Sequence, residues 1–414
     1  MKRMMLVLTA LSLLLSGCGF WNQGSYSSVT PHEEQVVVRE AGDITADDYT
    51  QLYSALESLV EKGVESAVIA MPYYDADRME TDLKTAILQV RKEHPIGSYA
   101  VDGIEYEIGT SSGVRAAAVE ITYLHDAAEI RKIQQAENMI QVQVLIRDSL
   151  DSCSADIVIE VEDYTEMDLA QFVEDYAMDH PEKVMEVPRV TVNAYPEKAT
   201  QTKVLEIKYT YETSRDSLRS MQAQVKPVFD SAVLYVSGDA DNGEKFLQLY
   251  SFLMERYDYQ FQTSITPAYS LLRHGVGDSK AFATVYAAMC TQAGLNCRVV
   301  SGTCEGEAWY WNVIFVDGHY HHLDLVRSAQ EGGYLLKNDS AMEGYVWDYA
   351  RVPVCDAEPP APTEPEETTA SAESESGDPQ STDPEPPEES QTPPDDTVPE
   401  ATSQTQPEET VPTP

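Results

Sequence analysis

The sequence lacks an apolar run long enough to cross a bilayer, and it is poor in basic residues. Its longest apolar stretch, Met4 to Leu15, has 12 residues, whereas a membrane-spanning helix needs about 20. Lys and Arg number 28 against 70 Asp and Glu, which gives a net charge of −42 and disfavours a nucleic-acid partner. Paired C-x-x-C spacing and nucleotide or flavin signatures are also missing. We therefore expect no metal and no cofactor.

The N-terminus has the pattern of an export signal. Lys2 and Arg3 precede the short apolar run, as in a signal peptide. The next four residues, Leu15-Ser16-Gly17-Cys18, resemble a bacterial lipobox. This resemblance implies cleavage before Cys18 and a lipid on its thiol. The protein would then be extracytoplasmic and held at the membrane of a Gram-positive bacterium. The acyl chains would provide the anchor, because each methylene buried in the bilayer contributes about 0.8 kcal/mol to membrane binding. The alternative is an ordinary secretory signal followed by a chance cysteine.

Five cysteines remain after Cys18, an odd number. They are Cys153, Cys290, Cys297, Cys304 and Cys355. An exported chain is free to form disulfides. Because Cys290 and Cys297 lie in apolar surroundings, buried free thiols are nevertheless favoured over a disulfide.

The two ends of the chain have the composition of flexible segments. Residues 18–34, after a signal peptide at 1–17, are polar and contain Gly and Ser, as a tether does. Residues 356–414 contain 17 acidic residues, no Lys or Arg, and 14 of the 23 prolines. Such a segment has too little apolar surface to offset the entropy of ordering, so we predict a disordered tail. A spacer, a wall-penetrating tail and a solubilising tail all remain open as its role.

The middle of the chain contains an internal repeat with an offset of 86 residues. Three anchors share this offset: His94-Pro95 with His180-Pro181, Asp82-Leu83 with Asp168-Leu169, and residues 119–123 with 205–209. Apolar spacing predicts a helix over 49–59, strands over 67–71, 103–108 and 117–123, and matching strands over 157–161, 189–195 and 204–211. The repeat therefore predicts two α+β modules with small antiparallel sheets, at 35–135 and 136–222. We interpret each His-Pro pair as a helix end whose His caps a carbonyl, rather than as a metal site.

The segment at 223–355 has a different pattern. Apolar spacing predicts helices over 243–257 and from 279 to 293, and strands over 297–302, 309–316 and 319–324. The succession of phrases, from Gly275-Val276-Gly277-Asp278-Ser279 through Trp311-Asn312 to Leu323-Asp324, resembles the bacterial transglutaminase-like domain, and it continues through residues 334–342, 344–348 and 353–355. That family shares its core with papain-type cysteine peptidases. The fold class that follows is α+β: two tandem modules, a transglutaminase-like domain and a disordered acidic tail.

The resemblance implies a catalytic triad at three positions of this chain. The family has a cysteine where this sequence has Ser279, a histidine where it has Trp309, and an aspartate where it has Asp324. A serine needs a neighbouring base to become a nucleophile, and an indole N–H only donates. Because triad members act as a unit, losing two should reduce turnover by roughly 10⁶. We therefore predict a domain that is not catalytic.

A relocated base would rescue a serine-based amidase or acyltransferase, and this alternative stays open. His322 lies on the return strand two residues before Asp324, so a Ser279–His322–Asp324 set is conceivable. His319 and His321 are expected to be exposed. Lys280 directly follows Ser279, and adjacent helix positions do not face each other, which disfavours a Ser-Lys dyad.

The aromatic strand at Trp309 and Tyr310 has two interpretations. Trp309 either plugs the former active site or forms a platform that stacks on a ligand, and the plug is favoured. In the platform case, Trp309, Tyr310 and His322 would bind a cell-envelope peptide, glycan or protein partner. A third possibility is that the domain is structural and that the two repeats are the working part.

Overall fold

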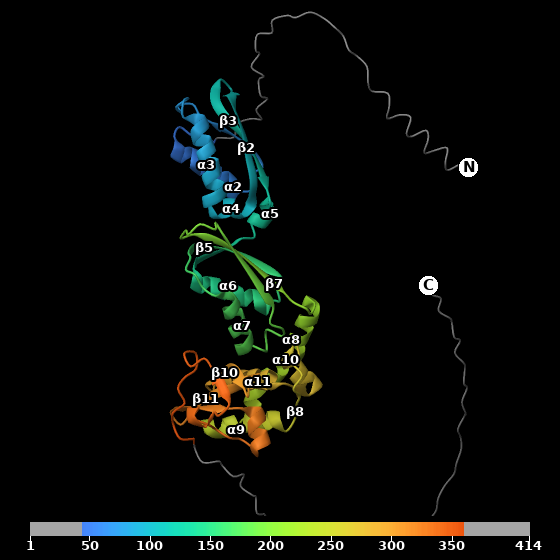
Figure 1. Cartoon of the computed structure of the whole chain (residues 1–414). Helices are drawn as coiled ribbons and strands as arrows, with labels where there is room; N and C mark the ends of the chain where they lie inside the picture. The colour runs from blue at the N-terminus through green and yellow to red at the C-terminus, as the bar shows by residue number, and fades with distance from the viewer. Residues whose placement is uncertain (1–43, 360–414) are drawn as a thin grey trace, which may run out of the picture. The chain divides into compact units, whose positions relative to one another are not determined.

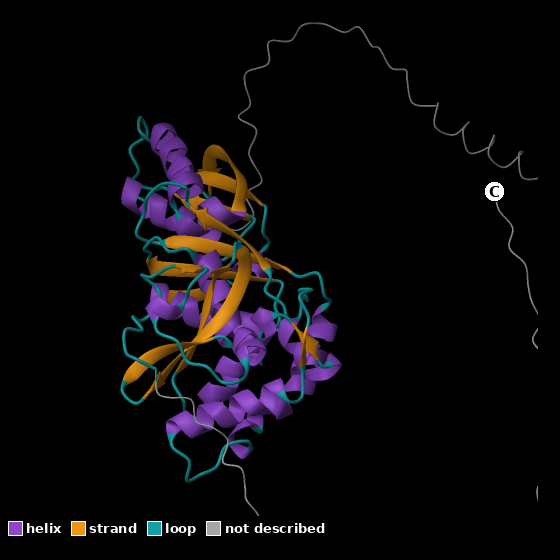
Figure 2. Ribbon diagram, turned by 60° about the horizontal axis from the view of Figure 1, so that its bottom comes forward, coloured by secondary structure: helices purple, strands orange, loops and turns teal. Residues whose placement is uncertain are grey.

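The computed structural model describes residues 44–359, and the chain is traced in Figure 1. Helices and strands both occur throughout these residues, so the fold class is α+β (Figure 2). The predicted lipid site at Cys18, the tether and nearly all of the acidic tail lie outside the described residues. Within residues 44–359, no helix combines the length and the apolar character that spanning a membrane requires.

The first segment contains one three-stranded antiparallel sheet. Its elements are α2 (Tyr49–Glu61), β1 (Ser66–Ala70), α3 (Met79–Glu93), α4 (Pro95–Ala100), β2 (Val101–Ser111), β3 (Val114–Tyr123) and α5 (Ala127–Ile130). The sheet order is β1-β3-β2. The apolar face of α2 is buried through Leu52, Leu56 and Leu59, as the spacing predicts, and Asp48 starts this helix by accepting a hydrogen bond from the Gln51 N–H.

The second segment has four strands. Its elements are β4 (Gln134–Asn138), α6 (Met139–Asp151), β5 (Asp156–Asp163), α7 (Leu169–Asp179), β6 (Arg189–Tyr195), β7 (Lys203–Thr210) and then α8 (Arg215–Asp230). The sheet order is β4-β5-β7-β6. The expectation of a wholly antiparallel sheet is wrong here, because the unpredicted strand β4 pairs parallel to β5.

The two segments share one connectivity. In each, a helix, a strand, a helix and two strands follow in order, and the last strand lies between the other two, as β3 does between β1 and β2 and β7 does between β5 and β6. The module boundaries and the repeat itself stay predictions from sequence.

The His-Pro pairs act differently from the expected carbonyl caps. His94 ends α3 and starts α4, because its Nδ1 accepts a hydrogen bond from the Gly97 N–H at 3.1 Å. The ring of His180 instead lies beside Glu182, with 3.2 Å between Nδ1 and Oε1. The carbonyl-cap expectation is therefore wrong for His94, where the proline begins a new helix at its favoured first position.

The third segment carries a four-stranded antiparallel sheet, and its fully buried side chains include the aromatic residues Trp311, Tyr286, Phe246 and Phe282. Its elements are η1 (Ala232–Leu234), α9 (Asn242–Met254), β8 (Asp258–Tyr259), α10 (Pro267–Tyr269), η2 (Ser270–His274), β9 (Val276–Gly277), α11 (Ser279–Gln292), β10 (Cys297–Cys304), β11 (Glu307–Val316), β12 (His319–Leu323), α12 (Leu325–Glu331), η3 (Asp339–Ala341) and β13 (Tyr345–Trp347). The sheet order is β12-β11-β10-β13. Helix α11 is buried almost along its whole length and packs on β10 and β11.

A glycine permits the edge strand to join this sheet. Gly302 on β10 faces Trp347 of β13 across the ladder. A Cβ atom at position 302 would collide with the Val346 carbonyl oxygen and would lie 2.8 Å from the Trp311 ring. Only a residue without a side chain therefore allows β13 and the Trp311 indole to pack this closely.

Candidate functional site

The three triad-equivalent positions lie together in the third segment. Ser279 is the first residue of α11, and Asp278 caps that helix by accepting a hydrogen bond from the Ala281 N–H at 2.9 Å. Trp309 on β11 donates its indole N–H to Asp324 Oδ2 at 2.5 Å. The backbone N–H of Tyr310, the next residue on β11, donates to Ser279 Oγ at 3.3 Å. The indole N–H thus donates to Asp324 as the N–H of a catalytic imidazole donates to its orienting carboxylate.

Asp324 accepts hydrogen bonds from three donors. It directly follows β12 and caps α12, where Oδ1 accepts the Arg327 N–H at 2.9 Å. The Tyr345 hydroxyl donates to Oδ2 at 2.7 Å, beside the indole N–H of Trp309. Burial raises the pKa of Asp324 above its usual value, and these hydrogen bonds oppose that shift. The carboxylate is therefore a fully used acceptor, and a structural task accounts for every contact that it makes.

Trp309 fills its site and is covered. The residue is 6% exposed. The Tyr259 ring lies 5.9 Å from the indole, and the Arg327 guanidinium lies over it at 5.4 Å. Arg327 is itself paired with Glu305 at 2.8 Å. An indole covered in this way has no free face on which a sugar or peptide could stack, so the geometry favours the plug over the platform.

Tyr310 and Lys280 form a separate, more accessible pair. Tyr310 is half-buried, and the Lys280 ammonium lies 5.3 Å from the centre of its ring, within the range of a cation–π contact. Among residues 44–359 the Tyr310 N–H is the hydrogen-bond partner of the Ser279 hydroxyl. Lys280 is therefore engaged with an aromatic ring and not with the serine.

His322 is buried and both of its ring nitrogens are engaged. Nδ1 receives the Trp311 indole N–H at 3.0 Å, and Nε2 lies 2.9 Å from Asp339 Oδ1. Because an indole N–H only donates, Nδ1 must be the acceptor, and Nε2 must carry the hydrogen. Burial lowers the pKa of His322, with the Asp339 carboxylate opposing that shift. The lone pair that a general base needs is therefore already used, and the structure does not bring His322 to Ser279.

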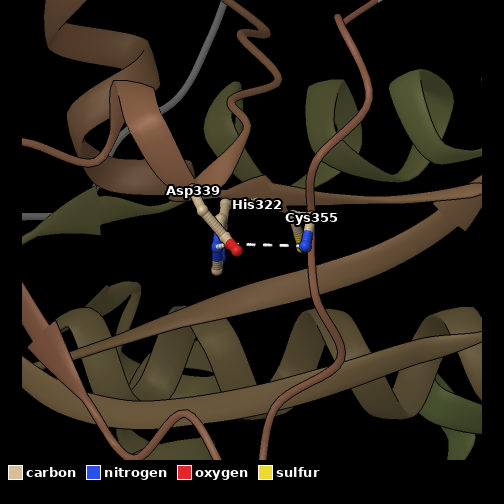
Figure 3. Close-up of side chains that lie close together, drawn as sticks. All are labelled: His322, Asp339 and Cys355. Carbon is tan, nitrogen blue, oxygen red and sulfur yellow. Dashed lines mark hydrogen bonds and ion pairs between the residues drawn. The ribbon is translucent and has the colours of Figure 1, made fainter.

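Figure 3 shows His322 with Asp339 and Cys355, three side chains of metal-binding type that meet in the third segment. Their candidate ligand atoms lie within 4.8 Å of one another. Asp339 Oδ1 also accepts the Cys355 N–H at 3.3 Å. A metal could bind Nε2 only through a free lone pair, and in this tautomer Nε2 carries a hydrogen instead. The cluster is therefore better explained as a set of hydrogen bonds that connects β12 to the chain around Asp339 and Cys355.

The other two histidines of this hairpin differ from each other. His319 is exposed, as expected from the sequence. The expectation for His321 is wrong, because this residue is 2% exposed and its Nδ1 has no hydrogen-bond partner among the described residues. Both faces of β12 are covered, so alternation along this strand does not separate buried from exposed positions.

Several contacts within this site carry no signal in the sequence. The Arg327 guanidinium lies over Trp309, 18 positions earlier in the chain, and Tyr345 reaches Asp324 across 21 positions. Tyr345 stands in a phrase that resembles the family, but that phrase does not predict its contact with Asp324. Asp339 likewise reaches His322 across 17 positions. Such contacts are set by tertiary packing, and no local pattern predicts them.

Comparison with known families gives a match in the third segment. Residues 231–334 match the model of the transglutaminase-like superfamily. This chain contains a transglutaminase-like domain. The match covers Ser279, Trp309 and Asp324, so the three positions belong to that domain. No curated protein matches the chain.

Three solved structures are similar to parts of the chain. A TGase is 11% identical, with 41% of this chain and 50% of that one covered and a TM-score of 0.23. A candidate cysteine protease from Cytophaga hutchinsonii is 13% identical, with 38% and 70% covered and a TM-score of 0.23. A candidate protease from Parabacteroides distasonis is 10% identical, with 62% and 39% covered and a TM-score of 0.21. The match thus spans half the length of the TGase, and TM-scores this low carry no argument about activity.

Proposed function

We propose that this protein is a lipid-anchored extracytoplasmic protein whose transglutaminase-like domain does not catalyse acyl transfer. In this proposal the domain serves as a module that binds a peptide, glycan or protein of the cell envelope. The observation that carries the proposal is the hydrogen bond from the Trp309 indole N–H to Asp324. The position that the family's base would occupy therefore holds an indole, which cannot accept a proton.

The chemistry around Ser279 supports the same conclusion. A serine hydroxyl becomes a nucleophile only when a base removes its proton. The hydroxyl oxygen here accepts a hydrogen bond from the Tyr310 N–H, and the lone pair of His322 is taken by Trp311. An oxygen that accepts a backbone hydrogen bond and faces no base stays protonated near neutral pH. The amidase or acyltransferase alternative therefore lacks the group that it requires.

The burial of Trp309 and His322 bears on how a partner would bind. Both side chains are at most 6% exposed, so neither offers an open surface to a ligand. Tyr310 keeps an accessible part of its ring beside Lys280. A partner would therefore contact Tyr310, Lys280 and the surrounding surface and would leave the former catalytic cleft closed.

An active-site-directed reagent tests the absence of catalysis. Purified protein is incubated with a fluorophosphonate probe, and the Ser279→Ala variant serves as the matched control. We expect the same low labelling in both proteins, because the hydroxyl has no base. Labelling of the wild-type protein that disappears in Ser279→Ala would contradict the proposal and support the serine-based alternative.

Rebuilding the triad provides a positive control for this test. In the double variant Ser279→Cys with Trp309→His, an imidazole beside Asp324 can lower the pKa of the new thiol. We expect iodoacetamide to modify position 279 faster in the double variant than in Ser279→Cys alone. Equal rates would show that the Trp309 position does not correspond to the family's base.

The lipid anchor is tested separately. Cells that express the full chain are grown with an alkyne-bearing palmitate analogue, and incorporation is compared between the wild-type protein and Cys18→Ser. We expect label and membrane association only with Cys18 present. Unlabelled wild-type protein released into the medium would instead favour an ordinary secretory signal.

A further inference from the structure

Two cysteines face each other at the end of the helix that carries Ser279. Cys290 lies in the last turn of α11, and Cys297 is the first residue of β10. Between them the chain reverses in a tight turn: Gly294 has a φ of +75°, and the Leu295 N–H donates to the Cys290 carbonyl at 2.8 Å. This turn returns the chain directly onto the helix end, and it places the Cys297 thiol near enough to the Cys290 thiol to contribute to raising its pKa.

The surroundings of the pair are apolar and unequal. Cys290 is completely buried, whereas Cys297 is half-buried. The Tyr334 hydroxyl, which is close to both thiols, is buried and has no hydrogen-bond partner among the described residues. Burial raises the pKa of the Cys290 thiol well above its ordinary value. Cys297 is therefore the member of the pair that a reagent in solution can reach first.

Other described cysteines have different neighbours. Cys304 Sγ accepts a hydrogen bond from the Arg327 guanidinium at 3.7 Å, and the Cys355 thiol donates to the Pro353 carbonyl at 3.5 Å. Neither contact brings a second sulfur into reach. The position where a short turn aligns two sulfur atoms is thus the junction of α11 and β10.

We propose that Cys290 and Cys297 form an intramolecular disulfide when the folded protein meets a low-molecular-weight or protein disulfide as oxidant. The Cys297 thiol loses its proton to solvent, and the thiolate attacks the oxidant, which forms a mixed disulfide and releases one thiolate. The Cys290 thiol then loses its proton, and its sulfur attacks the Cys297 sulfur and displaces the second thiolate. Two electrons pass to the oxidant, and each of its thiolates takes up one of the two protons.

The bond would tie the C-terminal end of α11 to the first residue of β10. It would fix a loop of few residues and so remove freedom from the unfolded chain. An extracytoplasmic location, where disulfides persist, is where this oxidation would take place. The proposal does not depend on whether the transglutaminase-like domain is catalytic, because neither sulfur contacts Ser279, Trp309 or Asp324.

The sequence allows a direct test by mass spectrometry. No Lys or Arg lies between Lys280 and Arg298, so trypsin releases both cysteines in one peptide, residues 281–298. The folded full-length protein is incubated with oxidised glutathione, denatured, alkylated with N-ethylmaleimide and digested. We expect this peptide to be unalkylated and lighter by two hydrogens, while the Cys153 peptide is alkylated.

Two outcomes would overturn the proposal. One is alkylation of both cysteines of the 281–298 peptide after prolonged incubation with excess oxidised glutathione. The other is a stable glutathione adduct on Cys297 with Cys290 still free, which would show that the second exchange does not occur.

A stability measurement on matched variants gives an independent readout. We expect dithiothreitol to lower the melting temperature of the oxidised wild-type protein by about 5 °C, from the entropy of closing a short loop. The Cys297→Ser variant should show no such shift, and Cys153→Ser should behave as the wild type does. An equal response of wild type and Cys297→Ser would contradict the assignment of the pair.

Discussion

Removing one indole N–H tests whether Trp309 is part of the folded core of this domain. In Trp309→Phe the ring still fills most of the site, but Asp324 loses the donor that lies 2.5 Å from Oδ2. A hydrogen bond to a charged group is worth about 1.5–3 kcal/mol. The smaller ring adds about 1 kcal/mol for the space left behind. We therefore expect the free energy of unfolding to fall by about 3 kcal/mol.

Trp347→Phe is the matched control for this change. Trp347 is 7% exposed, close to the 6% of Trp309, and packs edge-on against Trp311 at 5.8 Å between ring centres. Its indole N–H donates to no protein group among the described residues, so the substitution removes ring volume without removing a charge-assisted bond. We expect a cost of about 1 kcal/mol for this variant.

The measurement is urea unfolding of the full-length protein followed by far-ultraviolet circular dichroism, which does not depend on the tryptophans that are changed. The transition that the two variants affect belongs to the transglutaminase-like domain. A cost for Trp309→Phe no larger than that for Trp347→Phe would refute the reasoning, because the Asp324 contact would then contribute nothing. Such a result would reopen Trp309 as a residue held in place for a ligand.

Two further changes test the packing around the same sheet. Gly302→Ala should lower the free energy of unfolding by about 3 kcal/mol, because the new Cβ would collide with the Val346 carbonyl. The control is Gly103→Ala, whose new Cβ meets no atom within 4 Å. This control should be nearly neutral in the same urea assay. Burial lowers the pKa of His322 from 6.5, so the folded state binds a proton less readily than the unfolded state, and stability should fall as the pH drops below about 6.5. His322→Gln should make that fall shallower in unfolding curves measured between pH 7 and pH 5, and an unchanged slope would contradict the neutral assignment of His322.

Periodicity alone predicts much of the fold, and its failures have physical causes. The predicted strand at 189–195 coincides with β6, and the predicted helix from 279 coincides with the start of α11. Both have a strong pattern: alternating side chains in the first, and a long apolar run followed by Gly294 in the second. The strand β4 was missed because its polar residues Gln134–Asn138 have no apolar alternation, and parallel pairing to β5 is a tertiary contact.

The candidate site was predictable only as far as its local phrases extend. Ser279, Trp309 and Asp324 stand in recognisable phrases, so the sequence places them at one site. Strand alternation also places His322 near this sheet, but it cannot say that Trp311 and Asp339 take both of its nitrogens. That outcome depends on side chains from three separate strands and turns, which only the folded chain brings together.

The contacts of Asp324 give this aspartate a structural role that does not depend on catalysis. In an active enzyme of this kind the aspartate would only orient an imidazole. In this chain the same carboxylate also starts α12 through the Arg327 N–H and receives the Tyr345 hydroxyl from β13. Replacing it would leave buried donors without an acceptor, at about 1–3 kcal/mol for each. The contacts of Ser279 and Trp309, in contrast, do not require the cysteine and the histidine that the family has at these positions. The presence of Asp324 is therefore accounted for by stability, and it is not evidence that the site still catalyses a reaction.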